Sequence, residues 1–297
     1  MDTRIEQLTS RRAFLACERL QRELAGHDRQ QIISSSLSAA IHQSGGIILG
    51  AYDIAIKPPQ LIGCLIDLPR ADKPTSFCVT LLHNVRKEAR NHGIGYQLRL
   101  AERVECQERG LDFISWTIDP LYGIEAHLAL NKLGAIALSY RREYLSGRAD
   151  SSKQGFITDQ LEMEWWINSP RVSAIIDHGK PPAQFRIGFE QMEVITKTTL
   201  VNTVTRRLAQ IESRPTSNYL LFEIPAYLAP LQANYPELTQ DWRLKTRDAF
   251  ENLFNQGYAI SGFVHEAGRS FHLFERTEKR TLLKDEGRKK EQACSYN

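Results

Sequence analysis

The residues with the clearest capacity for chemistry lie in the segment 85–95, which follows one apolar stretch and precedes another. Gly93 and Gly95 let the backbone come close to a ligand, and a helix that begins beside them points unpaired N–H groups out of its first turn. Arg86, Lys87 and Arg90 add positive charge. This combination predicts a loop that binds a diphosphate. The spacing alone leaves one alternative open, a glycine-rich turn whose basic residues are solvated.

Two titratable side chains stand near the ends of the neighbouring apolar stretches. His83 comes two residues before Val85 and shares its side of a strand, and Asp119 follows the stretch 113–118. Either side chain could take a proton from a substrate as a general base. An ordinary strand histidine, and a turn or helix cap at Asp119, explain the same residues.

The elements that would position these residues follow from the hydrophobic spacing. Helical spacing and strand-length apolar stretches alternate through the first half of the chain. We expect helices at 11–24, 32–41, 94–108 and 124–133, and strands at 47–52, 61–68, 77–85, 113–118 and 136–140. This order predicts an α/β domain over residues 1–149.

A second domain is expected after residues 147–155, a stretch rich in Ser, Gly, Lys and Asp that we interpret as a linker. It would span residues 155–276. We expect strands at 185–189, 192–195, 219–224, 258–264 and 271–275, and helices at 200–211 and 241–256. The charged residues 277–297 have little to bury, which predicts a disordered tail.

Composition narrows the class of protein. The net charge of +3 is small for 297 residues, and basic and acidic residues are interspersed, so no footprint for nucleic acid is expected. Residues 1–12 lack the apolar core of a secretion signal, and no apolar run is long enough to span a membrane. The five cysteines are scattered and form no C-x-x-C pair, which argues against a disulfide framework and a thiolate metal site. We therefore expect a soluble, cytoplasmic protein without a metal.

Arg90-x-x-Gly93-x-Gly95 resembles the (R/Q)-x-x-G-x-(G/A) signature of the GNAT acyltransferases, which lies between a strand and a helix as it would here. Lys132-Leu133-Gly134 resembles the K-L-G turn after the next helix of that family. The chain is also similar, through to about residue 275, to a bacterial branch of predicted GNAT proteins, in the runs Trp116-Thr117-Ile118-Asp119-Pro120-Leu121, His127-x-x-x-Asn131 and Glu164-Trp165-Trp166-x-x-x-Ser169-Pro170-Arg171-Val172.

The resemblance implies a mixed α/β sheet flanked by helices and a direct transfer of the acyl group of acetyl-CoA, or another acyl-CoA, to an amine. The strand that ends at Val85 would part from the strand 113–119, with the thioester in the gap. The amine acceptor would be a small molecule. The implied coenzyme-binding residues are Val85, Arg86, Arg90, Asn91, His92, Gly93, Ile94 and Gly95.

The sequence departs from the family at the general acid. Many GNAT enzymes carry a tyrosine two residues before the lysine of K-L-G, and Leu130 stands there in this chain. Tyr140, Tyr144 and His127 are the alternative candidates for that proton donor, and each could equally be a structural residue. Asp119 and His83 remain the candidates for the base.

The second half resembles a degenerate GNAT-like unit that would enclose the acceptor. Between Ile224 and Trp242 it contains three prolines and no glycine, so the backbone has no loop for a diphosphate. Two functions fit these observations. The first is an acyl-CoA-dependent N-acyltransferase. The alternative is a module that binds acyl-CoA for sensing or scaffolding without turnover, which the leucine at position 130 keeps open.

Overall fold

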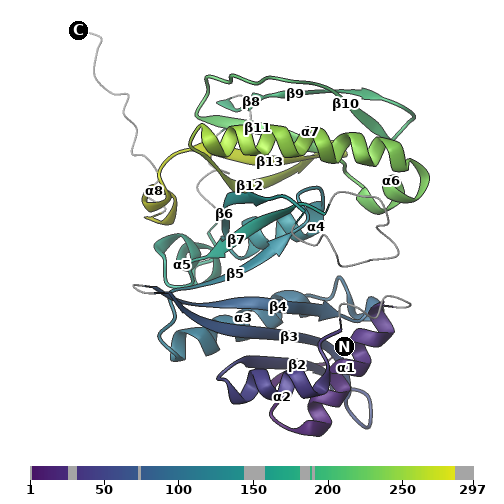
Figure 1. Cartoon of the computed structure of the whole chain (residues 1–297), viewed down its shortest axis with the longest axis vertical. Helices are drawn as coiled ribbons and strands as arrows, with labels where there is room; N and C mark the ends of the chain where they lie inside the picture. Colours follow the sequence, from purple (N-terminus) through teal and green to yellow (C-terminus); the bar gives the residue numbers. More distant parts are fainter. Residues whose placement is uncertain are drawn as a thin grey trace. The chain divides into compact units, whose positions relative to one another are not determined.

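The computed structural model describes residues 2–25, 32–72, 75–143, 158–180, 188 and 191–284. It is a mixed α/β protein that divides into two compact units (Figure 1). The first holds the described residues up to Trp116, and the second holds those from Thr117 on. The boundary therefore falls inside a strand, whereas the sequence placed it between residues 149 and 155. The expected linker 147–155 lies outside the described residues. The domain ranges stay predictions.

The first unit is built on five strands in the order in which they occur along the chain. Neighbouring strands pair antiparallel except β4 and β5, which are parallel because a helix crosses over between them. The strands are β1 (Thr3–Gln7), β2 (Ile47–Asp53), β3 (Gln60–Asp72), β4 (Thr75–Val85) and β5 (Phe113–Ile118). The sequence predicted all of these except β1, a short strand that is mostly polar.

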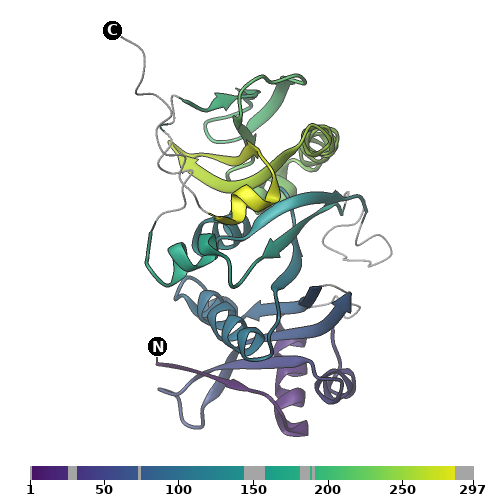
Figure 2. The same ribbon diagram turned by 90° about the vertical axis from the view of Figure 1, so that its left-hand side faces the viewer.

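Helices cover both faces of this sheet (Figure 2). They are α1 (Arg11–Ala25), α2 (Ser35–Gln43) and α3 (Ile94–Glu108). Cys64 of β3 packs into one core cluster with residues of α1 and α2, while the neighbouring Gly63 faces Leu98 and Ile94 of α3. Because successive strand residues point to opposite faces, α3 lies on the face opposite to α1 and α2. The sheet thus fixes the start of α3 beside the end of β4.

The second unit contains six sheet strands in the order β7-β6-β12-β13-β11-β8, and a separate hairpin of β9 with β10. All the pairs that the structure describes here are antiparallel except β11 with β8. The strands are β6 (Ile136–Arg141), β7 (Gln160–Trp165), β8 (Glu193–Val194), β9 (Thr196–Leu200), β10 (Arg206–Ile211), β11 (Tyr219–Ile224), β12 (Tyr258–Glu266) and β13 (Arg269–Arg276).

The long helix α7 (Pro236–Asn255) organises this unit. Phe250 on α7 packs edge-on against Phe222 and Phe274 of the sheet, and Trp242 donates a hydrogen bond from its indole N–H to the Arg206 carbonyl of β10, at 3.0 Å. The helix is therefore held between the sheet and the hairpin (Figure 1). The shorter helices are α4 (Gly123–Ala126), its π-helical continuation η2 (His127–Lys132), α5 (Pro170–Ile176), α6 (Leu228–Asn234) and α8 (Lys279–Lys284).

Two expectations for the second half were wrong. Residues 200–211 were expected to be a helix, but they hold the turn and the second strand of the β9–β10 hairpin, whose Leu208 is completely buried. The tail expected from residue 277 begins instead with α8, because Leu282 packs against Ile136 and Ala259. Residues 285–297 lie outside the described part, as does most of the expected strand 185–189. No helix in the described residues is long and apolar enough to cross a membrane.

Candidate functional site

The segment 85–95 is a strand-to-helix loop with two residues in the left-handed conformation. The Arg86 N–H, just after β4, donates to the Ile62 carbonyl at 2.7 Å, and a single 3-10 turn, η1 (Lys87–Ala89), follows. Asn91 has φ 63° and Gly93 has φ 79°. Asparagine and glycine are the residues that adopt such angles most readily, so the sequence specifies this bend.

The loop leaves a run of backbone N–H groups unpaired. The first helical hydrogen bond of α3 runs from the Gln97 N–H to the Gly93 carbonyl, at 3.0 Å. The N–H groups from Asn91 to Tyr96 have no hydrogen-bond partner among the described residues. Asn91, His92 and Gly93 are exposed. Unpaired donors at a helix N-terminus, where the helix dipole is positive, favour an anion.

The side chains of the loop are partly engaged with its own backbone. Arg90 donates from Nε to the Val85 carbonyl at 3.2 Å, and His92 Nδ1 lies 2.8 Å from the Arg90 carbonyl oxygen. Arg86 forms an ion pair with Glu23 at 2.8 Å. The sequence expected both arginines to supply charge to a ligand. Arg90 lies within the loop, whereas a carboxylate partly offsets the charge of Arg86.

His83 braces the first turn of α3. Its Nε2 lies 3.1 Å from the Gly95 carbonyl oxygen, and a Cβ at Gly95 would stand 3.3 Å from the imidazole Cε1. Since a carbonyl can only accept, Nε2 carries the proton. Burial, and then the charge of Arg99, lower the pKa of His83 to about 3. The ring is thus neutral at neutral pH and a weak base.

The strands β4 and β5 pair over a short distance. Their register runs from Phe77 opposite Phe113 to Val79 opposite Ser115, and the two phenylalanine rings stack with centroids 4.5 Å apart. β4 continues for six more residues, Thr80 to Val85, without a β5 partner in the described register. On the side where β5 lies, the end of β4 and the loop after it therefore make no ladder hydrogen bonds in the described register.

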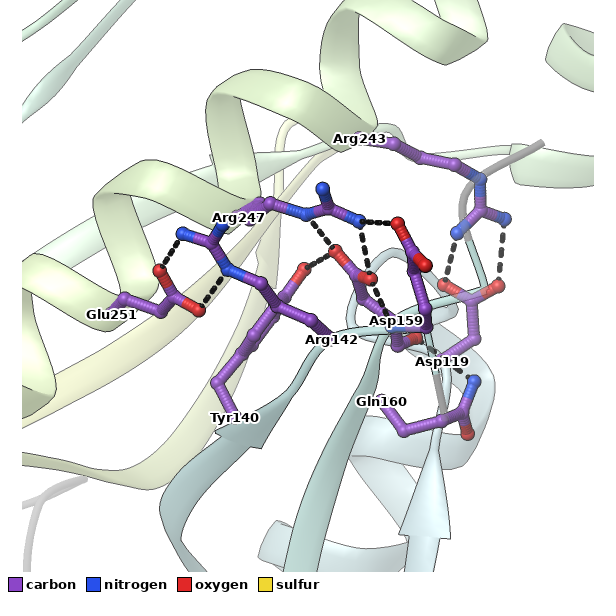
Figure 3. A network of polar contacts seen from close by, with 9 residues as sticks. Asp119, Tyr140, Arg142, Asp159, Gln160, Arg243, Arg247 and Glu251 are labelled. Atoms are coloured by element: carbon purple, nitrogen blue, oxygen red, sulfur yellow. Dashed lines mark hydrogen bonds and ion pairs between the residues drawn. The ribbon is translucent and has the colours of Figure 1, made fainter. Parts of the chain in front are cut away.

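Asp119 lies in the second unit and is held by an ion pair (Figure 3). Arg243 of α7 reaches both of its carboxylate oxygens, at 2.7 and 3.2 Å. The Leu121 N–H donates to one of these oxygens at 3.0 Å, which closes a turn. The turn that the sequence analysis allowed for Asp119 is therefore present. The sequence did not indicate Arg243 as a partner.

Tyr140 belongs to a second polar group beside the same helix (Figure 3). Its hydroxyl donates to Asp159 at 3.0 Å, and Arg247 binds both oxygens of that carboxylate at 2.7 and 2.8 Å. Burial, and then the negative charge of Asp159, raise the pKa of Tyr140. One turn further along α7, Glu251 pairs with Arg142. One face of α7 carries Arg243, Arg247 and Glu251, which are spaced four residues apart. This spacing is the feature of the sequence from which the network could have been predicted.

His127 stands on η2 at the surface of the second unit. Asn131, one turn later, has its amide nitrogen 3.2 Å from His127 Nδ1 and exchanges two hydrogen bonds with the Phe263 backbone of β12. Burial lowers the pKa of His127. Leu130, where the family resemblance expects a tyrosine, is completely buried. Of the other candidates for the acid, Tyr144 lies outside the described residues.

A buried group of metal-ligand type lies in the core of the first unit. Asp67, Cys78 and Cys106 bring their carboxylate and sulfur atoms within 4.8 Å of one another, although they are far apart in sequence. Burial raises the pKa of Asp67, and a hydrogen bond with Cys78 raises that of Cys106. These shifts favour the protonated, uncharged form of Asp67 and Cys106, and all three residues are completely buried.

The comparisons with known proteins yield similar solved structures. No family model matches the chain, and no curated protein does. The NatC complex bound to Gag peptide and CoA contains a similar chain, with 16% identity and a TM-score of 0.46, over 55% of this chain and 98% of that one. An N-acetyltransferase from Staphylococcus aureus Mu50 is 14% identical, with a TM-score of 0.44, over 56% and 99%. An acetyltransferase of the GNAT family from Streptococcus pneumoniae is 13% identical, with a TM-score of 0.45, over 55% and 98%.

Proposed function

We propose that this chain is a GNAT acyltransferase whose segment 85–95 binds the diphosphate of an acyl-coenzyme A. The observation that carries the proposal is the run of N–H groups from Asn91 to Tyr96, which have no partner among the described residues and lie at the N-terminus of a 15-residue helix. The motif Arg90-x-x-Gly93-x-Gly95 occupies this turn. A diphosphate is the ligand that such donors satisfy best.

The shape of the loop fits a close approach by the ligand. At Gly93 a Cβ would have a single heavy atom within 4 Å, Gln97 Nε2, so its outer side is open. Gly95 is braced from the inner side by His83, which keeps the first turn in place. We assign the diphosphate to the backbone of Asn91 to Gly95, with Arg90 and His92 beside it. Ile94 is buried, so its side chain anchors the loop to the core.

The coenzyme would supply a thioester, and an amine acceptor attacks its carbonyl directly. The N–C bond forms as the C–S bond breaks, the amine loses a proton, and the thiolate gains one. We propose that the backbone at Val85, in the part of β4 that has no β5 partner, holds the thioester carbonyl. A fixed N–H group there would stabilise the developing oxyanion. The acyl group is acetyl or longer, and the acceptor is proposed to be a small amine.

Four of the five candidates for the acid and the base lie in the described residues. His83 contacts Gly95 in the segment 85–95, which we call the coenzyme loop, and its low pKa suits a bracing role better than proton abstraction. Asp119 and Tyr140 have their polar atoms engaged by Arg243 and Asp159. His127 is exposed, and partial burial of its ring lowers its pKa. We propose that positioning of the amine contributes more to the rate than proton transfer.

Two measurements test the proposal in sequence. Acetyl-CoA, propionyl-CoA or CoA at millimolar concentration should raise the melting temperature, because a ligand that binds the native state stabilises it. No shift with any of the three contradicts the coenzyme site. Release of free CoA from acetyl-CoA is then followed with a panel of small amines. Turnover supports the transferase, whereas binding without turnover on any amine supports the sensing or scaffolding module.

A further inference from the structure

The second unit contains a pocket of about 480 Å³ at the carboxyl end of β11. It lies between α6, the loop of the β9–β10 hairpin and the turn between β12 and β13. β11 ends at Ile224 and α6 begins at Leu228, and the short connection between them, which starts with Pro225, lines the pocket. Sites for small molecules typically measure about 300–1,000 Å³, so the pocket has room for one compact ligand.

The pocket carries a net positive charge, because two guanidinium groups line it and only one carboxylate does. Glu223 is 2% exposed, and Arg269 binds both of its oxygens, at 3.0 and 2.6 Å. Arg206 adds a contact from Nε at 3.3 Å. Two cations thus face one anion whose oxygens are already occupied. A cationic ligand would find no free carboxylate oxygen there, whereas an anionic ligand meets a surplus positive charge.

Hydrogen-bond donors remain for that ligand. A guanidinium has five N–H groups, and Arg206 uses Nε for its contacts with Thr198 and Glu223. Its two terminal nitrogens have no partner among the described residues. The side chains of Arg206 and Arg269 are 30% and 35% exposed, so both are accessible from the pocket.

Aromatic and apolar side chains form the other wall. Tyr227 is 60% exposed, Tyr235 is 37% exposed and Val204 is 69% exposed, and all three line the pocket. Tyr235 accepts a hydrogen bond at its hydroxyl from the Asn202 amide at 2.9 Å, which fixes the ring. Apolar side chains that converge on a pocket favour a ligand with a flat apolar body.

We propose that this pocket binds a small organic carboxylate with an aromatic body, at a site separate from the coenzyme loop. The carboxylate pairs with Arg206 and Arg269, and the ring packs against Tyr227 and Tyr235. The pocket lies wholly within the second unit, and the coenzyme loop lies in the first. The proposal therefore does not depend on the acyltransferase assignment.

The test compares two probes of equal shape, naphthalene-2-carboxylate and naphthalene-2-carboxamide, titrated into the full chain by calorimetry. The carboxylate should bind about tenfold more tightly, because charge-assisted hydrogen bonds to guanidinium are stronger than neutral ones. Arg206→Gln should remove most of that difference. Arg269 keeps its pair with Glu223 in this variant, so the fold is expected to survive, and a melting curve checks it.

Matched variants and a competition complete the experiment. Arg214→Gln removes an exposed arginine of the same unit outside the pocket and should leave both affinities unchanged. Tyr227→Ala should weaken both probes alike, while Leu244→Ala, an exposed position on α7, should not. Saturating CoA should not displace the carboxylate. Equal affinities of the two probes, absence of binding, an equal effect of Arg214→Gln, or displacement by CoA would each overturn the proposal.

Discussion

The coenzyme loop can be tested by a pair of glycine substitutions that cost the same in stability and differ in position. Gly93 immediately precedes α3 with φ 79°, and Gly110 follows its other end with φ 67°. A Cβ at Gly110 would have no heavy atom within 4 Å, and at Gly93 it would have one, at 4.0 Å. Neither alanine would clash, so backbone strain is the remaining cost. An L-residue in this conformation loses about 1–2 kcal/mol.

Gly93→Ala and Gly110→Ala should therefore lower the free energy of unfolding by the same amount, about 1–2 kcal/mol, in urea titrations. Gly93→Ala should also weaken CoA binding about tenfold or more, equivalent to about 1.4 kcal/mol, because the methyl group stands among the unpaired N–H groups. Gly110→Ala should bind CoA like the parent chain. If calorimetry gives the two variants equal CoA affinity while both fold, the assignment of the loop is refuted.

Three further results are expected. Calorimetry should give one CoA per chain, since the segment after β11 has Pro225 and no glycine before α7; two sites would contradict this. Arg243→Gln should cost about 3–5 kcal/mol of stability by removing the cationic partner of Asp119, and adding Asp119→Asn should recover part of it; an additive double variant would disprove the coupling. Burial lowers the pKa of His272 to about 4, so stability should fall by about 3 kcal/mol from pH 6.5 to pH 4, and His272→Gln should abolish that part.

The pH effect has a structural origin in the neutral imidazole of His272. The ring is completely buried, and its Nε2 lies 2.7 Å from the Pro120 carbonyl oxygen. Nε2 therefore carries the proton, and Nδ1 has no partner among the described residues. Protonation at Nδ1 would place an unpaired charge among aromatic rings. The unfolded chain binds that proton near pH 6.5, so acid favours unfolding. A parallel loss of stability in the His272→Gln variant would show that another group is responsible.

The elements that the sequence predicted best are those whose patterns are local. The helix 94–108 and the strands 113–118 and 219–224 coincide with α3, β5 and β11. In each, the apolar periodicity and the flanking residues predict the same element. Gly110, for example, follows α3 and has a positive φ. The bend of the loop at Gly93 was readable for the same reason, because glycine is the residue that this backbone angle favours.

The elements that the sequence missed depend on contacts that are distant in the chain. Residues 196–211 are rich in Thr and Val, a composition typical of strands, and this signal was available. The helix α8 has no such signal. It is held because Leu282 enters a core formed by β6 and β12, and because Lys279 pairs with Glu164 of β7 at 2.5 Å. A charged segment with two leucines gives no local indication of these partners.

For the polar residues too, local features could be predicted from the sequence, whereas distant partners could not. A charged face on α7 could be read from the spacing of Arg243, Arg247 and Glu251, but the identity of its partners could not. Asp119 lies far from Arg243 in the chain, and a strand-ending aspartate in front of a proline is typical of a cap, a turn or a catalytic base. The structure describes an ion pair and a turn at this residue. Its carboxylate is thus engaged before any substrate arrives.

This engagement bears on how an acyl transfer could proceed. A general base needs a free lone pair and a pKa near the working pH. The Asp119 oxygens accept from Arg243 and Leu121, Tyr140 holds its proton against Asp159, and the pKa of His83 lies near 3. A direct transfer needs no covalent enzyme intermediate, and orientation of the amine against the thioester can supply much of the rate. In the proposed transfer, the loop before α3, which bends at Gly93 and is braced by His83, would hold the coenzyme in place for that attack.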